Sequence, residues 1–148
     1  MSACTFFGHR DCPDTIKPAL RRALSDLIEN AHVDTFYVGN QGSFDRIVRS
    51  VLRELSDQYP HIRYAVVLAY LPEQAPYEED FSDTMSPEGL EAVHPKYAIS
   101  RRNQWMLDHS TYVVTYITHS WGGAARFVEK AKRTGKTVRF LVDLHFPQ

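Results

Sequence analysis

The sequence predicts an α/β fold, a Rossmann-like open parallel sheet of about five strands with helices on both faces. Short apolar runs alternate along the chain with segments whose apolar residues recur at helical spacing, and such alternation builds parallel sheets. The apolar runs are mostly continuous rather than strictly alternating, as expected of strands that are covered on both faces. We expect right-handed crossovers between them.

The predicted strands are short apolar runs. The third is the most continuous, with Tyr64-Ala-Val-Val-Leu-Ala-Tyr70 at its centre, and the first is closed by the loop Gly8-His9-Arg10. In order, the five predicted strands are Cys4–Phe7, Thr35–Val38, Arg63–Tyr70, Tyr112–Ile117 and Thr137–Val142.

Helical segments join these strands. Asp14 or Thr15 is the predicted cap of the first helix. A later helix covers Ala98–His109, and the last one starts at glycines and runs to about Arg133, with Gly135 as its stop. The first two helices have a buried face of apolar residues at helical spacing: Ile16, Leu20, Leu24, Leu27 and Ile28 in one, and Phe44, Ile47, Val48, Val51, Leu52 and Leu55 in the other.

Residues 71–97 interrupt this alternation. They contain four prolines and the acidic run Glu78-Glu79-Asp80. Long loops in compact domains are usually functional or mobile. We therefore predict a single domain over residues 1–148, in which a long loop over residues 71–97 passes over the mouth of the site.

Composition and charge exclude several classes of protein. The chain has 43% hydrophobic and 24% charged residues, as in an ordinary globular domain, and its net charge of -1 provides no basic field for nucleic acid. No apolar run approaches the roughly 18–20 residues of a membrane span, so we expect no membrane partner. The start of the chain does not resemble a signal peptide, and two cysteines do not form a disulfide framework. These features predict a reduced, cytoplasmic setting.

Three loops are expected to meet at the carboxyl edge of the sheet: Gly8-His9-Arg10, Gly39–Asp45 and Ser120–Gly123. Glycine allows the backbone amides to approach an anion such as phosphate, and the last loop leads directly into a helix N-terminus. Arg102 upstream and Glu129 downstream would face the same crevice. The candidate ligand-binding residues are Gly8, His9, Arg10, Gly39, Asn40, Gly42, Asp45, Arg102, Asn103, Ser120, Gly122 and Gly123.

The motifs of two common nucleotide-binding classes are absent. Neither Gly-x-Gly-x-x-Gly after the first strand nor Gly-x-x-x-x-Gly-Lys-Ser/Thr occurs, which argues against a classically bound nicotinamide cofactor and against P-loop hydrolysis. The seven histidines show no metal-ligand spacing. We therefore predict no cofactor and no metal site.

Several of these residues also admit a purely structural interpretation. Asp45 could complement a helix dipole. Arg102 and Glu129 could both belong to solvated helix faces. Trp105 has core-like spacing, although either Trp105 or Trp121 could stack on a base.

Three segments resemble motifs of a known family. Cys4-Thr-Phe-Phe-Gly-His-Arg10 is similar to the "FTGHR" opening of the YpsA-like branch of the SLOG superfamily, a group of uncharacterised bacterial proteins. Val38-Gly-Asn-Gln-Gly-Ser-Phe-Asp45 occupies the place of its "SGxAxGxD" loop, which DprA shares in looser form. Arg102-Asn-Gln-Trp-Met-Leu-Asp-His-Ser110 is very similar to its "RNxWMVDHSD" segment. The resemblance spans nearly the whole chain.

A related resemblance concerns the lonely-guy phosphoribohydrolases. Gly122-Gly123 with Glu129 matches the spacing of their Pro-Gly-Gly-x-Gly-Thr-x-x-Glu motif. It implies that Arg102 binds and polarises the ribosyl side of a nucleoside 5′-monophosphate and that the glycines hold the phosphate. Glu129 would then stabilise the developing oxocarbenium or activate water.

The chain departs from that motif where the helix begins. Trp121, Ala125 and Arg126 stand where the enzymes have proline, glycine and threonine. We therefore predict binding of a nucleotide or nucleotide derivative, such as AMP, ADP-ribose or NAD. Hydrolysis of the N-glycosidic bond is the alternative. Nucleic-acid binding, as in DprA, is a second alternative, against which the net charge argues. The related enzymes complete their sites across a dimer, so a homodimer is an alternative assembly for this chain.

Overall fold

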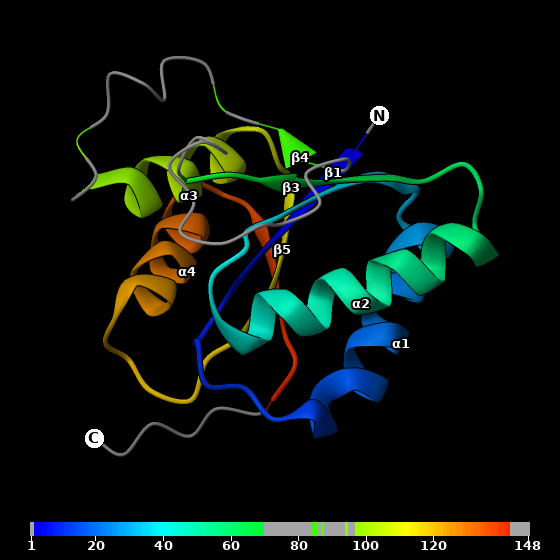
Figure 1. Ribbon diagram of the computed structural model, residues 1–148, viewed down its shortest axis with the longest axis horizontal. Coiled ribbons are helices and arrows are strands. Elements are labelled where there is room, and N and C mark those ends of the chain that lie inside the picture. The colour runs from blue at the N-terminus through cyan, green and yellow to red at the C-terminus, as the bar shows by residue number, and fades with distance from the viewer. Residues whose placement is uncertain (1, 70–83, 86, 88–93, 95–96, 143–148) are drawn as a thin grey trace.

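Six strands form one parallel sheet in the order β4-β3-β2-β1-β5-β6, as the computed structural model shows (Figure 1). The structure describes residues 2–69, 84–85, 87, 94 and 97–142. The strands are β1 (Ser2–Gly8), β2 (Val33–Val38), β3 (Arg63–Val67), β4 (Thr84–Met85), β5 (Tyr112–Tyr116) and β6 (Thr137–Phe140). The helices are the 3₁₀ turn η1 (Asp14–Ile16) and α1 (Lys17–Asn30), α2 (Gly42–Gln58), α3 (Ala98–Asp108) and α4 (Gly123–Arg133).

The sheet reverses its order at β1. This strand pairs with β2 on one side, with Thr5 opposite Tyr37, and with β5 on the other, with Gly8 opposite Tyr116. The chain therefore builds β1 to β4 outward in one direction, then returns and builds β5 and β6 in the other. In open α/β sheets, ligands bind beyond the carboxyl ends of the strands at such a reversal.

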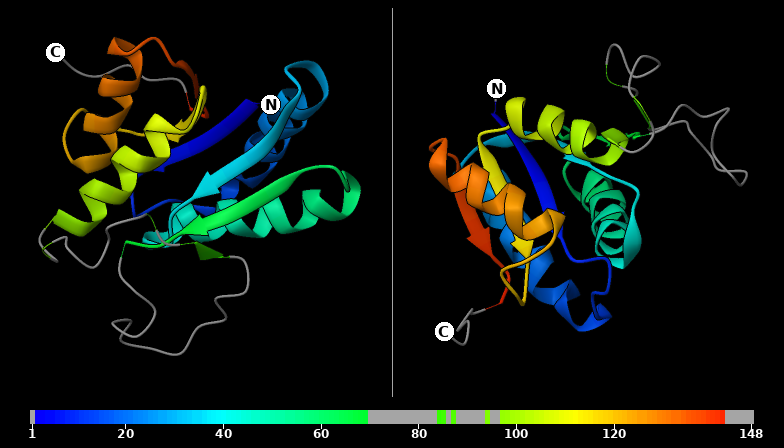
Figure 2. Two further views of the ribbon diagram at one scale, coloured as in Figure 1. Left: turned by 90° about the horizontal axis from the view of Figure 1, so that it is seen from above. Right: turned by 90° about the vertical axis from the view of Figure 1, so that its left-hand side faces the viewer.

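Helices cover both faces of the sheet, as predicted. Figure 2 shows α1 and α2 on one face and α3 and α4 on the other. Each face has its own apolar cluster: Leu24 and Leu52 belong to the first, and Met106 and Val128 to the second. Within the part of the chain that the structure describes, no helix combines the length and apolar character needed to cross a membrane.

The strand count differs from the prediction by one. Thr84–Met85 forms β4, which pairs with Val66 and Val67 of β3 at the edge of the sheet. A two-residue strand is too short to produce a periodic sequence pattern, which is why this segment was expected to belong to the long loop. Most of residues 71–97 lies outside the described residues, and so does the predicted passage of that loop over the site.

The predicted cap of the first helix is wrong. Asp14 and Thr15 lie inside η1, and the N-cap of α1 is Ile16, which forms no side-chain capping bond. Pro18 occupies the first turn of α1, where its missing N–H has no helical partner to lose. The turn and the proline together start this helix without a polar cap.

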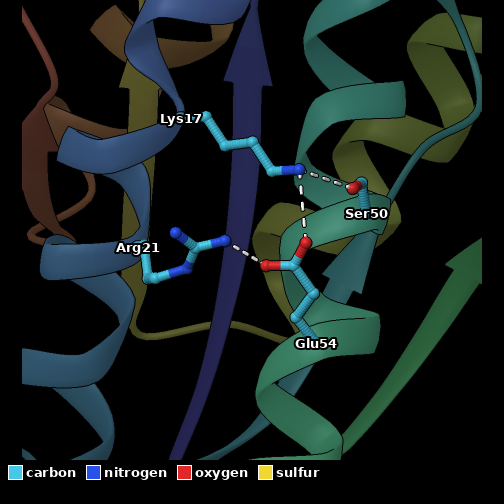
Figure 3. Close-up of polar contacts among 4 residues, drawn as sticks. All are labelled: Lys17, Arg21, Ser50 and Glu54. Carbon is cyan, nitrogen blue, oxygen red and sulfur yellow. Dashed lines mark hydrogen bonds and ion pairs between the residues drawn. The ribbon is translucent and has the colours of Figure 1, made fainter.

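Polar contacts join α1 and α2 (Figure 3). The carboxylate of Glu54 pairs with Arg21 and, at 3.3 Å, with the Lys17 Nζ, which also donates to the Ser50 Oγ at 3.1 Å. The three charged side chains are between 34% and 45% exposed, and ion pairs that water can reach contribute little to stability. The buried contacts beneath them hold α2 in place.

Two substitutions on α2 test this division. Leu52→Ala removes a fully buried side chain and is expected to lower the free energy of unfolding by about 2–5 kcal/mol. Glu54→Gln, less than one turn away on the exposed side, is expected to have a much smaller effect. Urea denaturation of both variants measures the two changes, and an equal loss in both would contradict the assignment.

Candidate functional site

A cavity of about 270 Å³ lies at the reversal of the sheet order. It is enclosed by the end of β1, the starts of α2 and α4, and one side of α3. Figure 1 shows the loops that follow β1 and β5 at the same end of the sheet as the start of α2. The lining residues are Phe6, Phe7, Gly8, His9, Arg10, Gln41, Asp45, Ile99, Arg102, Asn103, Met106, Gly123 and Ala124.

A buried arginine lies in the wall of this cavity. Arg102 on α3 is only 2% exposed. Its Nη1 donates to the Val67 carbonyl at 3.2 Å, and its Nε donates to the Asn103 Oδ1 at 2.8 Å. A Cβ on Gly39 would lie 2.5 Å from the Nη1 and 2.7 Å from the Asp45 Oδ2. Glycine at position 39 therefore leaves the space that the guanidinium and the carboxylate both adjoin.

Asp45 combines a structural and a site position. Its Oδ2 accepts a hydrogen bond from the Gln41 N–H at 3.0 Å, at the beginning of α2, and its side chain lines the cavity. Burial raises the pKa of this carboxyl, while the charge of Arg102 and the Gln41 N–H act in the opposite direction. Asp45 therefore supports the helix start, as the structural interpretation expected, and also balances a buried cation.

The loop after β1 is tied to the start of α2. The Ser43 N–H donates to the Arg10 carbonyl at 2.8 Å, and the Ser43 Oγ accepts from the Cys12 N–H at 2.7 Å. Gly42 has a φ of +87°, and a Cβ there would lie 2.6 Å from the Arg10 Cα. The backbone of Arg10 can approach α2 this closely only because residue 42 is glycine.

The N-terminus of α4 opens into the same cavity. Gly122 is its N-cap, with a φ of +98° and no side-chain capping bond, and Gly123 and Ala124 line the cavity. The first amides of a helix have no partner within the helix and carry the positive end of its dipole. This end of α4 therefore presents amide donors to an anion.

His9 lies between the cavity and the loop that follows β5. Its N–H continues the sheet by donating to the Tyr116 carbonyl at 3.1 Å, and its ring stacks on His119 at 3.7 Å between centroids. Burial, and secondarily the neighbouring His119, lowers the pKa of His9. The buried Nε2 of His9 has no hydrogen-bond partner among the described residues. A neutral imidazole with an available nitrogen is thus part of the wall.

The structure brings together most of the predicted ligand-binding residues. Those lining the cavity are Gly8, His9, Arg10, Asp45, Arg102, Asn103 and Gly123. Gly39, Gly42 and Gly122 shape the loops but do not line the cavity. The Asn40 side chain accepts a 3.5 Å hydrogen bond from the neighbouring Gln41 side chain. Ser120 lies instead in a second cavity of about 690 Å³ between α4 and β6.

Glu129 does not face the crevice that contains Arg102, contrary to expectation. It is exposed and lines the second cavity, together with Lys132 and Arg133. Six residues of α-helix rotate a side chain by about 240°, so a residue six positions after Gly123 points away from the cavity that Gly123 lines. The chain has the spacing of the lonely-guy motif between Gly123 and Glu129, but the turn of α4 directs these two residues to different cavities.

Sequence reasoning missed the apolar part of the wall. Ile99 and Met106 face the cavity from α3 alongside Arg102, at spacings that place them on one side of the helix. Their helical periodicity was available in the sequence, but it is the same for a residue that packs in the core. Gln41, which also lines the cavity, was predicted only as a member of the Gly39–Asp45 loop and not as a site residue.

No metal site forms in the described ranges. Among those residues, no three His, Cys, Asp or Glu side chains gather in a way that could hold an ion. Both cysteines are free and buried. Burial, with Asp14 and Asp11 nearby, raises the pKa of the Cys12 thiol to about 12, so this residue is a poor nucleophile.

The fold and the cavity define the class of protein. A parallel sheet with a glycine-lined cavity at its point of reversal is a Rossmann-like α/β domain. The chain belongs to the YspA SLOG family (YpsA), whose family model matches residues 3–144. This confirms the resemblance inferred from the loop motifs. No curated protein sequence matches the chain.

A solved structure has the same fold. The X-ray structure of DNA processing protein A (DprA) from Streptococcus pneumoniae matches with a TM-score of 0.70 and 14% identity, over 95% of this chain and 50% of that one. The chain thus spans half the length of the DprA chain in that structure. At this identity, the likeness concerns the fold alone.

Two glycine substitutions distinguish a packed position from an open one. Gly39→Ala is expected to lower the free energy of unfolding by about 1–3 kcal/mol, because its Cβ would press on Arg102 and Asp45. Gly123→Ala has no atom within 4 Å of the added Cβ and is expected to leave stability unchanged or slightly raised. Thermal and urea denaturation measure both. A stable Gly39→Ala protein would show that Arg102 is not held as described.

The pKa of His9 provides a test by NMR. We expect His9 to titrate below the ordinary value of about 6.5, and His119→Phe to raise its pKa part of the way. Since the folded pKa is the lower one, the unfolded chain takes the proton more readily. His9 therefore lowers stability as the pH falls below about 6.5, until the folded pKa is passed. A His9 pKa at or above 6.5 would contradict the stacked, partly buried geometry.

Proposed function

We propose that this protein binds a nucleotide or nucleotide derivative, with its phosphate at the N-terminus of α4 and its sugar against Arg102. AMP, ADP-ribose and NAD are the ligands we expect. The observation on which this rests most is that Arg10, Arg102 and the first amides of α4 all lie around one cavity at the reversal of the sheet.

The charges around the cavity favour an anion. Arg10 and Arg102 bring two positive charges, of which Asp45 offsets one. Because Arg102 is already held by the Val67 carbonyl and the Asn103 side chain, little order remains to be gained when a ligand arrives. A preorganised guanidinium beside free amides is an arrangement suited to phosphate and sugar oxygens.

Binding is better supported than hydrolysis. The hydrolase alternative needs a carboxylate beside the sugar, and the residue expected to supply it, Glu129, lies in the other cavity. We therefore propose that this chain is a ligand-binding protein that acts as a sensor of its nucleotide.

A thermal-shift panel tests the proposal. AMP, ADP-ribose, NAD, GMP and ribose 5-phosphate are each titrated against the wild-type protein, Arg102→Ala and Glu129→Gln. A ligand that binds the native state raises the melting midpoint by mass action. We expect a rise with at least one nucleotide in the wild type, its loss in Arg102→Ala, and its full retention in Glu129→Gln.

Two controls make the panel decisive. Circular dichroism establishes that Arg102→Ala is folded, since removal of a buried guanidinium beside Asp45 also affects stability. Chromatography for released base then measures turnover. A wild type that responds to none of these compounds would overturn the proposal. Base release that depends on Glu129 would instead support the hydrolase alternative.

A further inference from the structure

We propose that the exposed face of Trp121 is the platform on which the ligand's base stacks. This inference rests on the proposed function and extends it from phosphate and sugar to the third part of a nucleotide. It assigns the base a place outside the cavity, on the loop between β5 and α4. The ligand class it selects is a phosphate-bearing sugar with a planar heteroaromatic ring.

Three rings form a continuous stack at this loop. His9 stacks on His119 with centroids 3.7 Å apart and planes 16° apart, and His119 stacks on Trp121 at 3.8 Å and 18°. The first ring follows β1 and the other two follow β5, which are neighbouring strands of the sheet. One face of the indole is therefore covered and fixed in orientation by an imidazole.

The rest of the indole is open. Trp121 is 69% exposed, the most exposed of the large apolar side chains in the described part of the chain. A large aromatic ring left in water gives up the stability that its burial would provide. The stack fixes the orientation of the indole and leaves its second face exposed to solvent. A further aromatic ring can stack on that face.

The cavity is small for a ligand the size of a nucleotide. Its volume of about 270 Å³ is below the roughly 300–1,000 Å³ of pockets that enclose most of a drug-sized ligand. With the phosphate and the sugar in the cavity, we place the base beyond its edge. Trp121 directly precedes Gly122 and Gly123, the start of the helix whose amides face the phosphate position. His9 joins the two places, because it lines the cavity and also forms the inner end of the stack.

The other exposed aromatic rings, Tyr97 and Phe140, do not have this combination, and neither does the half-buried Trp105. Tyr97 is the N-cap of α3, its ring lies 6.2 Å from that of His94, and it does not line the cavity. Phe140 lines the second cavity, with the Lys132 Nζ 5.0 Å from its ring centroid, on the far side of α4. Trp105 packs edge-on against Tyr37 and stacks on His109, away from the cavity lining. Trp121 is the exposed ring that continues a wall of the cavity.

The test compares a ligand with a base to one without it. Isothermal titration measures the affinities of AMP and ribose 5-phosphate for the wild type, Trp121→Ala, Trp121→Phe and Trp105→Phe. Stacking on an aromatic side chain contributes about 1–3 kcal/mol per base. Trp121→Ala is therefore expected to weaken the binding of AMP by about fivefold to a hundredfold. The affinity for ribose 5-phosphate should change far less. Trp121→Phe should recover most of the AMP affinity, and Trp105→Phe should match the wild type.

A spectroscopic readout identifies the ring directly. In Trp105→Phe, Trp121 is the one remaining tryptophan of the chain. AMP is expected to quench its fluorescence, because a base would lie against the indole, and ribose 5-phosphate is not.

The outcomes separate this inference from the proposed function. Wild-type binding of AMP that is unchanged in Trp121→Ala would overturn the platform and leave the nucleotide site intact. Equal affinities of the wild type for AMP and ribose 5-phosphate would do the same. If neither compound binds, the titrations are repeated with the nucleotide that raised the melting midpoint of the wild type; if no compound of the panel did so, both proposals fail. A change in sedimentation, with AMP affinity unaltered, would show that the ring packs against a second copy of the chain instead.

Discussion

The burial of one positive charge organises this end of the molecule. Arg102 is almost fully inaccessible, and a guanidinium in that position is tolerated only when its donors are satisfied and a carboxylate is near. The Val67 carbonyl, the Asn103 side chain and Asp45 meet that requirement from three separate elements. Gly39 meets it by having no side chain. Sheet, α2 and α3 are therefore held in a fixed relation around a single group, and the cavity lies beside it.

The reversal of the sheet explains why an anion site forms here. At β1 the crossovers change direction, so the helices on the two sides diverge and leave a space above the strand ends. At the start of α2, the carboxylate of Asp45 accepts a hydrogen bond from the Gln41 N–H. The start of α4 makes no hydrogen bond to a capping side chain. Only one of the two helix ends thus remains available to a ligand. The stacked rings of His9, His119 and Trp121 then extend the wall of that space toward solvent.

Local patterns were sufficient for most of the fold. Helical spacing located the buried faces of α1 and α2 because packing on a sheet requires an apolar stripe, and all of their predicted apolar residues are buried. Glycine loops located the site because close backbone approach is possible for few other residues, as Gly39 and Gly42 show. Prediction failed where the signal is not local. The pairing of β4 depends on a neighbouring strand, and the start of α1 depends on a turn and a proline rather than on a polar cap.

The sequence by itself determined the alternation of strands and helices apart from β4, the family, and the loops that meet at the carboxyl edge. Periodicity, glycine positions and motifs are properties of short segments. Only the tertiary structure decided which side chains share a space. Arg102 looks in the sequence like one of two adjacent surface arginines, yet the packing of α3 buries it. Glu129 looks like its catalytic partner, yet the turn of α4 directs it to another cavity. The physical reason is that spacing along a chain defines a direction only after the helix that contains it has been placed against the sheet.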